Sequence, residues 1–405
     1  MFLGMEKMQY IRVGTCYFKK VNAPTIAGDF NEILVPWNID TIKQDYGKDF
    51  IGRIPRYDGF TCIPGHMDYK QVYSGFYNRY FPLSHSPQEG KTMVSLFFVK
   101  HIFGSQYELG LDYLQLLYLK PVHILPILCL VSWERSTGKS TFLKWLKAIF
   151  ENNLTYLTND NFGSQFNSDW TNKLLICIDE VLFNKEELTE RIKYLSTTNY
   201  NKLEAKGRDK VEIEFFGKFI LCSNNEDNFI KIDAAEERFW VRKIPKLKAE
   251  DTQLLSKLVK EIPAFLFYLN HRKLSTWESS RMWFHPQQIQ TTALLNLIKH
   301  NRSRVEKELA NILLVVMEQY DLDEIDFCPL DAMYAVNQTR VKTDLTQIRR
   351  ILKKDWQLTP KENSLSYEKF ILWGKGEISR ETGTGRFYTV KKDFLLENFD
   401  ELMRE

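Results

Sequence analysis

The sequence lacks paired cysteines, long hydrophobic runs and a strong charge of one sign. Its six cysteines are scattered without a C-x-x-C pair, which argues against a zinc ribbon and against the disulfide framework of a small secreted protein. Cys62 and His66 resemble half of a metal site, but the sequence offers no second half, and separate structural roles are favoured. The most apolar run, 124–133, is too short to cross a bilayer.

Repeats, low-complexity tracts and the layout of a signal peptide are also missing. The net charge is only +3, so any surface that binds nucleic acid has to be local. Hydrophobic residues make up 44% of the chain, enough for a sizeable core. We therefore expect a globular, cytoplasmic protein without membrane association.

Composition and periodicity divide the chain into five parts. Glycine, proline, tyrosine and aspartate are frequent in the first part, whereas the second has apolar residues at helical spacing up to Pro121. The predicted parts are an irregular leading segment over 1–91, a helical lead-in over 92–120, an α/β core over 121–248, a helical region over 249–318 and a small domain over 319–405.

The predicted core alternates between strands and helices. Apolar strands are expected at 124–132, 174–178 and 219–222, and amphipathic helices at 139–151 and 186–195. Such alternation favours a mainly parallel sheet with helices on its faces.

The turn between the first of these strands and the first helix reads Trp-Glu-Arg-Ser-Thr-Gly-Lys-Ser-Thr at 133–141. A Walker A loop requires this context, because backbone N–H groups and the helix dipole then face the phosphates. Lys139 is expected to reach the β- and γ-phosphates of ATP, and the Ser140 hydroxyl to bind Mg²⁺. The motif departs from the full pattern at Trp133, where glycine is expected. The predicted ATP-binding residues are Arg135, Ser136, Thr137, Gly138, Lys139, Ser140 and Thr141.

Two acidic residues end the second strand, about 40 residues after the loop. Asp179 is expected to hold Mg²⁺, and Glu180 to polarise the attacking water as a general base. The alternative is that both residues are merely solvated acids at the end of a buried strand. The position of Asp179 and Glu180 after a phosphate loop favours the Walker B interpretation instead.

Two further residues complete the predicted catalytic set of Lys139, Glu180, Asn224 and Arg238. Asn224 follows the third strand and is placed to contact the γ-phosphate or the attacking water, although an Asn-Asn pair also forms ordinary turns. Arg238 is placed to stabilise transition-state charge on the nucleotide of an adjacent subunit. Its alternative is a surface salt bridge with Glu236 or Glu237.

The order of these motifs resembles that of superfamily 3 helicases. The resemblance covers 92–245 and is closest to primase-helicases of phages and plasmids, including the poxvirus-like branch and family proteins of intestinal Bacteroidales. It implies an AAA+-like P-loop NTPase fold, ATP and Mg²⁺ as cofactors, a homo-hexameric ring, single-stranded DNA as partner and a bacterial host cell. No primase signature is evident, so a primase or other replication proteins would be separate partners.

In this family a β-hairpin projects into the pore of the ring and a basic residue on it grips DNA. The equivalent segment here is 203–210, and its DNA-binding candidates are Lys206, Arg208 and Lys210. Glycine at position 207 permits a tight turn, and a strand-like run follows at 211–216. A surface hairpin without a DNA role is the alternative.

The last part is expected to form a winged-helix-like domain. A helix is predicted over 343–354 with Thr343 as its N-cap, and strands are predicted at 367–373 and 386–390 around a Gly-rich connection. Basic residues on such a helix are often merely solvated. The residues with predicted DNA contacts are Arg349, Arg350 and Lys353.

Together these patterns predict an ATP-dependent DNA helicase or translocase of phage or mobile-element replication. A nucleotide-switched DNA-binding initiator or loader without unwinding activity is the second hypothesis. A protein that keeps the fold without turnover is the third, motivated by Trp133.

Overall fold

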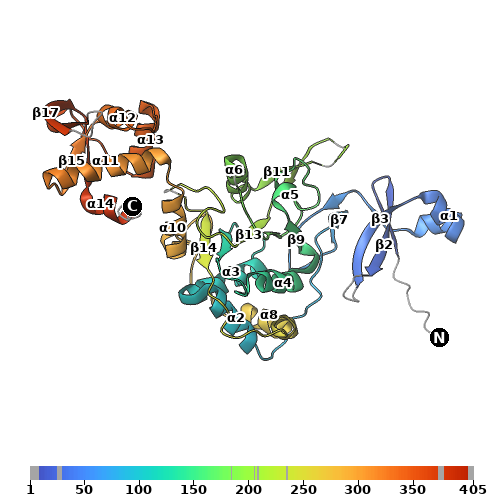
Figure 1. The fold of residues 1–405 in the computed structure, drawn as a ribbon. Helices are drawn as coiled ribbons and strands as arrows, with labels where there is room; N and C mark the ends of the chain where they lie inside the picture. Colours follow the sequence, from blue (N-terminus) through green and yellow to red (C-terminus); the bar gives the residue numbers. More distant parts are fainter. Residues whose placement is uncertain are drawn as a thin grey trace.

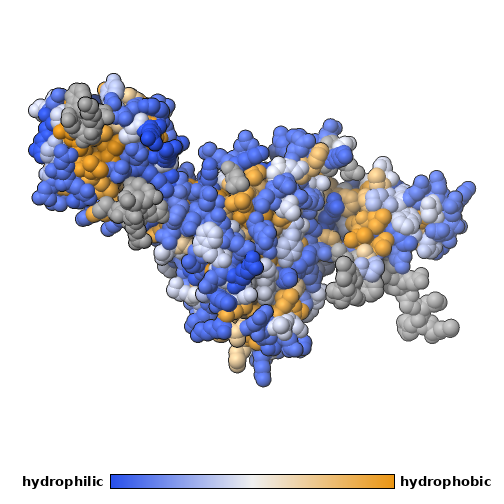
Figure 2. All heavy atoms as spheres, in the orientation of Figure 1, coloured by the Kyte–Doolittle hydropathy of each residue, from blue (hydrophilic) through white to orange (hydrophobic). Residues whose placement is uncertain are grey.

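A computed structural model describes residues 9–24, 30–183, 185–204, 206–207, 209–233, 236–372 and 378–399. A strand-rich N-terminal part and a small C-terminal module lie at opposite ends of a central α/β body (Figure 1). Hydrophilic residues cover most of the visible face, with apolar patches over the N-terminal strands and the C-terminal module (Figure 2). Among the described residues, no helix is both long and apolar enough to span a membrane.

The composition of the N-terminal part predicts an irregular segment, but the structure shows two small sheets there. The first has the order β3-β2-β1-β4, and the second has the order β5-β7-β6. Apart from β2 and β3, these strands have two to four residues and are separated by glycine and proline, which hides their alternation in the sequence. Their bounds, with the intervening helices, are β1 (Tyr10–Val13), β2 (Cys16–Pro24), β3 (Phe30–Trp37), α1 (Ile39–Tyr46), η1 (Lys48–Arg53), β4 (Arg56–Tyr57), β5 (Phe60–Thr61), β6 (Val72–Tyr73) and β7 (Phe76–Asn78).

The helical lead-in is two helices rather than the one predicted over 92–120. Gly104 separates them and has a φ of 51°, a conformation that glycine adopts without strain. A side chain there would also collide with the Arg242 guanidinium, since a Cβ would lie 2.9 Å from its Nη2. The elements are α2 (Met93–Phe103), η2 (Gly104–Gln106) and α3 (Tyr107–Leu119).

The central sheet has five strands in the order β14-β8-β13-β10-β9, and each neighbouring pair is parallel. This confirms the predicted parallel sheet with helices on its faces. Two of its strands, β9 and β14, were not predicted. The strand bounds are β8 (Ile127–Val131), β9 (Leu154–Leu157), β10 (Leu175–Ile178), β13 (Lys218–Ser223) and β14 (Phe239–Lys243).

Helices bury both faces of this sheet, which explains why its strands are continuously apolar. In β8, Leu128 and Leu130 face one core, whereas Ile127, Cys129 and Val131 face the other. Figure 1 shows α2, α3, α4 and α8 below the sheet, α5 and α6 above it, and α10 beside β14. The helices not yet bounded are α4 (Lys139–Phe150), η3 (Glu151–Asn153), α5 (Asn159–Gly163), α6 (Glu186–Leu195), α7 (Leu254–Lys260), α8 (Ile262–His271), α9 (Pro286–Ile289) and α10 (Thr292–His300).

The C-terminal module has its own hydrophobic core. Strand β15 pairs with β18, and β16 pairs with β17 as a hairpin. The predicted Gly-rich connection over 374–385 is therefore largely strand, and the predicted helix begins later, with Asp344 rather than Thr343 as its N-cap. The elements are α11 (Arg304–Tyr320), β15 (Glu324–Phe327), α12 (Pro329–Asn337), α13 (Leu345–Arg350), a π turn η4 (Ile351–Asp355), β16 (Leu365–Leu372), β17 (Ile378–Gly385), β18 (Tyr388–Lys391) and α14 (Lys392–Phe399).

Candidate nucleotide site

The predicted phosphate loop connects the end of β8 to the start of α4. Gly138, the residue just before α4, has a φ of 89°, which a side chain would strain. A Cβ at this position would also lie only 3.1 Å from the Phe98 ring. Glycine is therefore required where the chain turns into the helix, and the first N–H groups of α4 are left free for an anion.

Lys139 lies inside this loop. Its ammonium group donates to the carbonyl of Ser132 at 3.1 Å, across the base of the turn. Burial lowers the pKa of Lys139, while Asp179 opposes the shift through its charge. Two more contacts hold the loop from outside. The His101 ring forms a hydrogen bond with the Thr137 carbonyl at 2.9 Å, and Leu247 N–H donates to the Ser136 carbonyl at 3.2 Å.

The acidic pair follows β10 at the same edge of the sheet. The Ser140 hydroxyl donates to Asp179 Oδ2 at 3.2 Å, so two oxygen ligands of the kind that Mg²⁺ prefers converge from separate elements. Both residues are exposed and can admit water and phosphate oxygens as further ligands. This donor set fits Mg²⁺, which takes one or two carboxylates rather than an all-protein cage.

Glu180 adopts a left-handed backbone conformation with a φ of 58°. Such a residue costs on the order of 1 kcal/mol or more and persists when its surroundings fix it. Here the Asn159 side chain donates to the Glu180 carbonyl at 3.2 Å, and Glu180 N–H donates to Asp179 Oδ1 at 3.1 Å. The Glu180 side chain is exposed beside the loop edge.

Asn224 lies at the carboxyl end of β13, between the loop strand and the acidic strand. The register pairs Ser223 with Val131 and Leu221 with Ile178, which brings all three strand ends to one edge. The Asn224 side chain is exposed there. The structure thus brings together Lys139, Ser140, Asp179, Glu180 and Asn224, as predicted from the order of their strands.

Two further residues connect the elements of this edge, and the sequence alone assigned a role to neither. The Ser223 hydroxyl donates to the Val181 carbonyl at 2.9 Å and joins the acidic strand to the Asn224 strand. The Glu226 carboxylate accepts from Trp133 N–H at 2.9 Å and pairs with Lys243 at 2.7 Å. Ser223 belongs to the Ser223-Asn224 motif of the family resemblance, whereas Glu226 belongs to no spaced motif and only its position just after Asn224 offered a signal.

Arg238 is not part of this cluster. It precedes β14, and Ile127 N–H donates to its carbonyl, which places Arg238 at the opposite edge of the sheet. Its guanidinium donates to both oxygens of the buried Glu236 at 2.9 Å, as in the salt-bridge alternative. Lys193 also pairs with Glu236, at 3.1 Å.

The predicted hairpin is present and extends from the central body beside β11 (Figure 1). Strands β11 (Tyr200–Leu203) and β12 (Val211–Glu214) are antiparallel. Lys206 is exposed beside Gly207, which has a φ of 73°, whereas Lys210 pairs with Glu204 at 2.7 Å. Arg208 lies outside the described residues.

The predicted basic residues of the C-terminal module are all exposed. Arg349 belongs to α13, and Lys353 follows in η4. Both line an open groove of about 600 Å³ together with Lys369 of β16 and Arg386 of the connection between β17 and β18. Arg350 lies outside this groove's lining.

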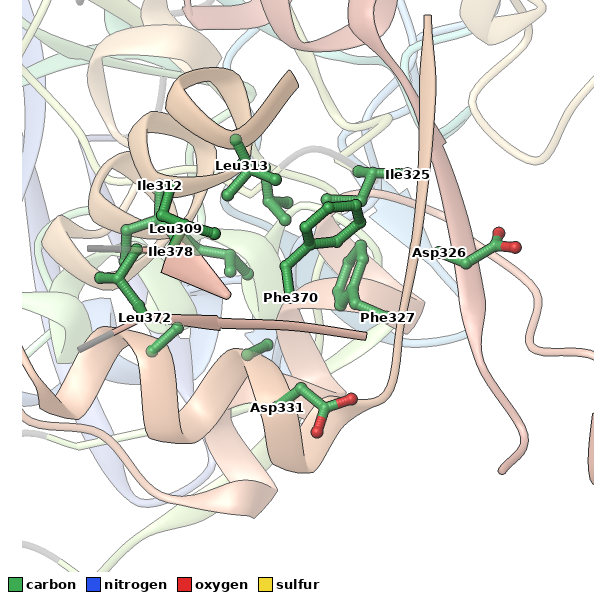
Figure 3. Close-up of a pocket in the computed structure, with 13 residues that line it drawn as sticks. Leu309, Ile312, Leu313, Ile325, Asp326, Phe327, Asp331, Phe370, Leu372 and Ile378 are labelled. Carbon is green, nitrogen blue, oxygen red and sulfur yellow. The ribbon is translucent and has the colours of Figure 1, made fainter. Parts of the chain in front are cut away.

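The module also encloses a cavity of about 30 Å³ with apolar walls, from which the carboxylates of Asp326 and Asp331 point away (Figure 3).

A family of unknown function, DUF5906, matches residues 130–242. The DNA primase-polymerase of Nitratiruptor phage NrS-1 is 28% identical over 152 residues, which are 34% of this chain and 21% of that protein. The match thus spans about a fifth of the relative's length. An apo structure of the NrS-1 C-terminal region superposes with a TM-score of 0.61 at 17% identity and covers 93% of this chain and 95% of that one. An A-form structure of the same region gives 0.60 at 18% identity, over 92% and 94%.

This chain has the fold of the NrS-1 C-terminal region. The match to the family spans the phosphate loop, the acidic pair, Asn224 and Arg238, and it ends within β14. The likeness to the NrS-1 region extends over nearly the whole chain, so the N-terminal strands and the C-terminal module belong to the shared architecture.

Proposed function

We propose that the protein is an ATP-dependent DNA helicase or translocase of phage or mobile-element replication, of the superfamily 3 type. The observation that carries the proposal is the convergence of Lys139, Ser140, Asp179 and Asn224 at one edge of a parallel sheet. The similarity in sequence to a phage DNA primase-polymerase and in fold to its C-terminal region supports a role in phage replication.

In this proposal the loop over 133–141 binds the triphosphate of ATP. The backbone N–H groups of the loop and the N-terminus of α4 face the phosphates, and Lys139 neutralises their charge. Ser140 and Asp179 hold Mg²⁺, which would offset charge on the phosphate oxygens. Glu180 orients the attacking water, and Asn224 contacts that water or the γ-phosphate.

Arg238 is assigned to the nucleotide of a neighbouring copy in a homo-hexameric ring. The loop begins where β8 ends, whereas Arg238 lies where the neighbouring strand β14 begins. Five strand residues separate these edges by about 16 Å, so Arg238 is too far from the loop of its own copy. This placement supports a role in trans over a role in cis.

Single-stranded DNA is the proposed partner of the hairpin. Lys206 carries an exposed side chain at its turn, and Lys210 adds a second positive charge beside Glu204. The C-terminal module is proposed to be winged-helix-like, because α11, β15, α12, α13 and the β16–β17 hairpin follow in that order. Its groove gathers Arg349 and Lys353 with strand residues, and this supports a second contact with the DNA backbone.

The test is steady-state ATP hydrolysis with and without single-stranded DNA, combined with a strand-displacement assay. We expect DNA-stimulated hydrolysis and unwinding, both lost in Lys139→Ala and Asp179→Asn, while Lys307→Ala on α11 serves as a distant control. Stimulated hydrolysis without unwinding would favour the initiator or loader hypothesis. Hydrolysis that persists unchanged in Lys139→Ala would refute the nucleotide site itself.

A further inference from the structure

Glu226 connects three elements at the phosphate edge. It follows β13, its Oε1 accepts from the backbone N–H of Trp133, and its Oε2 pairs with Lys243 at the end of β14. The two distances are 2.9 Å and 2.7 Å, and only 12% of the Glu226 side chain is exposed. One carboxylate thus joins the first residue of the phosphate loop to both strands that flank β8.

A short turn holds Glu226 in this place. The Asn225 side chain accepts from the N–H groups of Asp227 at 3.0 Å and Asn228 at 2.8 Å, and Asn225 N–H donates to the Ser223 hydroxyl at 3.1 Å. Such side-chain-to-backbone bonds fix the chain in a tight turn. Asn224 and Glu226 therefore belong to one rigid unit, in which Asn224 is exposed and Glu226 is directed at the loop.

The contact is made at the position where this loop departs from the Walker pattern. The Trp133 side chain is 57% exposed, so the protein holds this residue by its backbone rather than by its ring. Among the described residues, Glu226 is the sole hydrogen-bond partner recorded for Trp133 N–H. The remaining loop anchors act further along, at Glu134, Ser136 and Thr137.

Lys243 makes a carboxylate tolerable beside a triphosphate. A bare negative charge next to the loop would repel the phosphates, whereas the ion pair with Lys243 offsets it. The Lys243 side chain is 63% exposed, so the pair itself adds little stability. Its effect is on the local charge at the loop.

We propose that Glu226 is a positioning residue of the ATP site, which fixes the start of the phosphate loop and couples it to the Asn224 turn. The inference rests on the proposed function, namely that this loop binds ATP. A charged acceptor on the Trp133 N–H holds the loop in its binding conformation, and a change at Asn224 reaches the loop through the same turn. Glu226 itself does not touch the phosphates.

The test compares three variants of the full chain with the wild type. Glu226→Ala removes the acceptor, Glu226→Gln keeps an acceptor without charge, and Glu318→Ala on α11 is a matched, exposed control. The affinity for a fluorescent ATP analogue is measured by titration with Mg²⁺. Loss of a charge-assisted hydrogen bond predicts about tenfold weaker binding in Glu226→Ala, while Glu226→Gln stays within about threefold of the wild type.

A second readout does not depend on nucleotide. Amide hydrogen exchange of the segment 130–138 should accelerate in Glu226→Ala and remain slow in Glu226→Gln and Glu318→Ala. Glu226→Ala with wild-type affinity, or with unchanged exchange at 130–138, would overturn the proposal, as would a lower melting temperature with unchanged affinity. If the wild type itself bound no ATP analogue, the proposed function would fail, and the exchange data would separately show whether the Glu226 contact exists.

Discussion

Lys218 begins β13, the strand that leads to Asn224, and it is buried, with 3% of its surface exposed. Its ammonium group donates to the carbonyls of Phe216 and Pro121. Burial lowers its pKa from 10.5 to about 7, because the charged form loses its hydration. In the unfolded chain the pKa of lysine is ordinary, so between these two values the unfolded state binds more protons than the folded state.

The sign of the effect on stability follows from this difference. As pH rises from 7 toward 10.5, the free energy of unfolding increases, by about 1.4 kcal/mol per pH unit from Lys218 alone. Below pH 7 both states are protonated, and the full cost of burying the charge, about 5 kcal/mol, opposes folding. Lys218→Met removes this titration, although it also leaves two carbonyls without their donor, at about 1–3 kcal/mol each.

We therefore predict the change with pH rather than the difference at one pH. From pH 7 to pH 9 the wild type should gain about 2.3 kcal/mol relative to Lys218→Met, because the folded state is half-protonated at pH 7. For cooperative unfolding of a 405-residue chain this corresponds to a relative shift in melting temperature of about 3 °C, measured by scanning calorimetry at both pH values. Lys210→Met, at an exposed lysine, is the control and should follow the wild type. If the melting temperatures of the wild type and Lys218→Met changed by the same amount between pH 7 and pH 9, the buried, titrating lysine would be refuted.

Two further predictions concern the hairpin and the C-terminal module. Lys206→Ala should weaken binding of labelled single-stranded DNA and reduce the salt dependence by about one phosphate contact, measured by fluorescence anisotropy. Lys210→Ala should have a smaller effect, because its ammonium group already pairs with Glu204; an equal effect would contradict this ranking. Val316→Ile should fill part of the apolar cavity shown in Figure 3 and raise the free energy of unfolding by up to about 1 kcal/mol, measured by urea titration. A lower free energy of unfolding would mean that the rigid cavity walls do not accommodate the added methyl group.

The phosphate edge could be predicted because each of its motifs is local. An apolar strand followed at once by Asp179 or Asn224, or by a short turn and Lys139, is visible in a short window, and parallel strands necessarily bring such ends to one edge. The contact between Glu226 and Trp133 joins residues 93 positions apart through a backbone N–H. No side-chain pattern records such a contact, so it could not be predicted.

The errors at the two ends of the chain have a related cause. Most N-terminal strands have too few residues to show alternation, and aromatic contacts between elements add to their stability, such as that of the Phe18 and Phe60 rings with centroids 5.2 Å apart. Strand β17 contains Gly383 and Gly385, which read as a loop in isolation. Its pairing with β16 along eight residues supplies the order that its composition lacks.

The place of Arg238 in the sheet bears on the proposed ring assembly. Because all five strands are parallel, the loop and Arg238 lie at opposite edges, and no side-chain movement within one copy brings them together. Action on a neighbouring nucleotide requires Arg238 to leave Glu236, and this would be costly if it stranded a buried carboxylate. Lys193 removes that difficulty, because its ammonium group stays 3.1 Å from Glu236 and continues to offset its charge. In the proposed assembly, the Lys193–Glu236 pair would allow Arg238 to exchange Glu236 for a phosphate of the neighbouring copy.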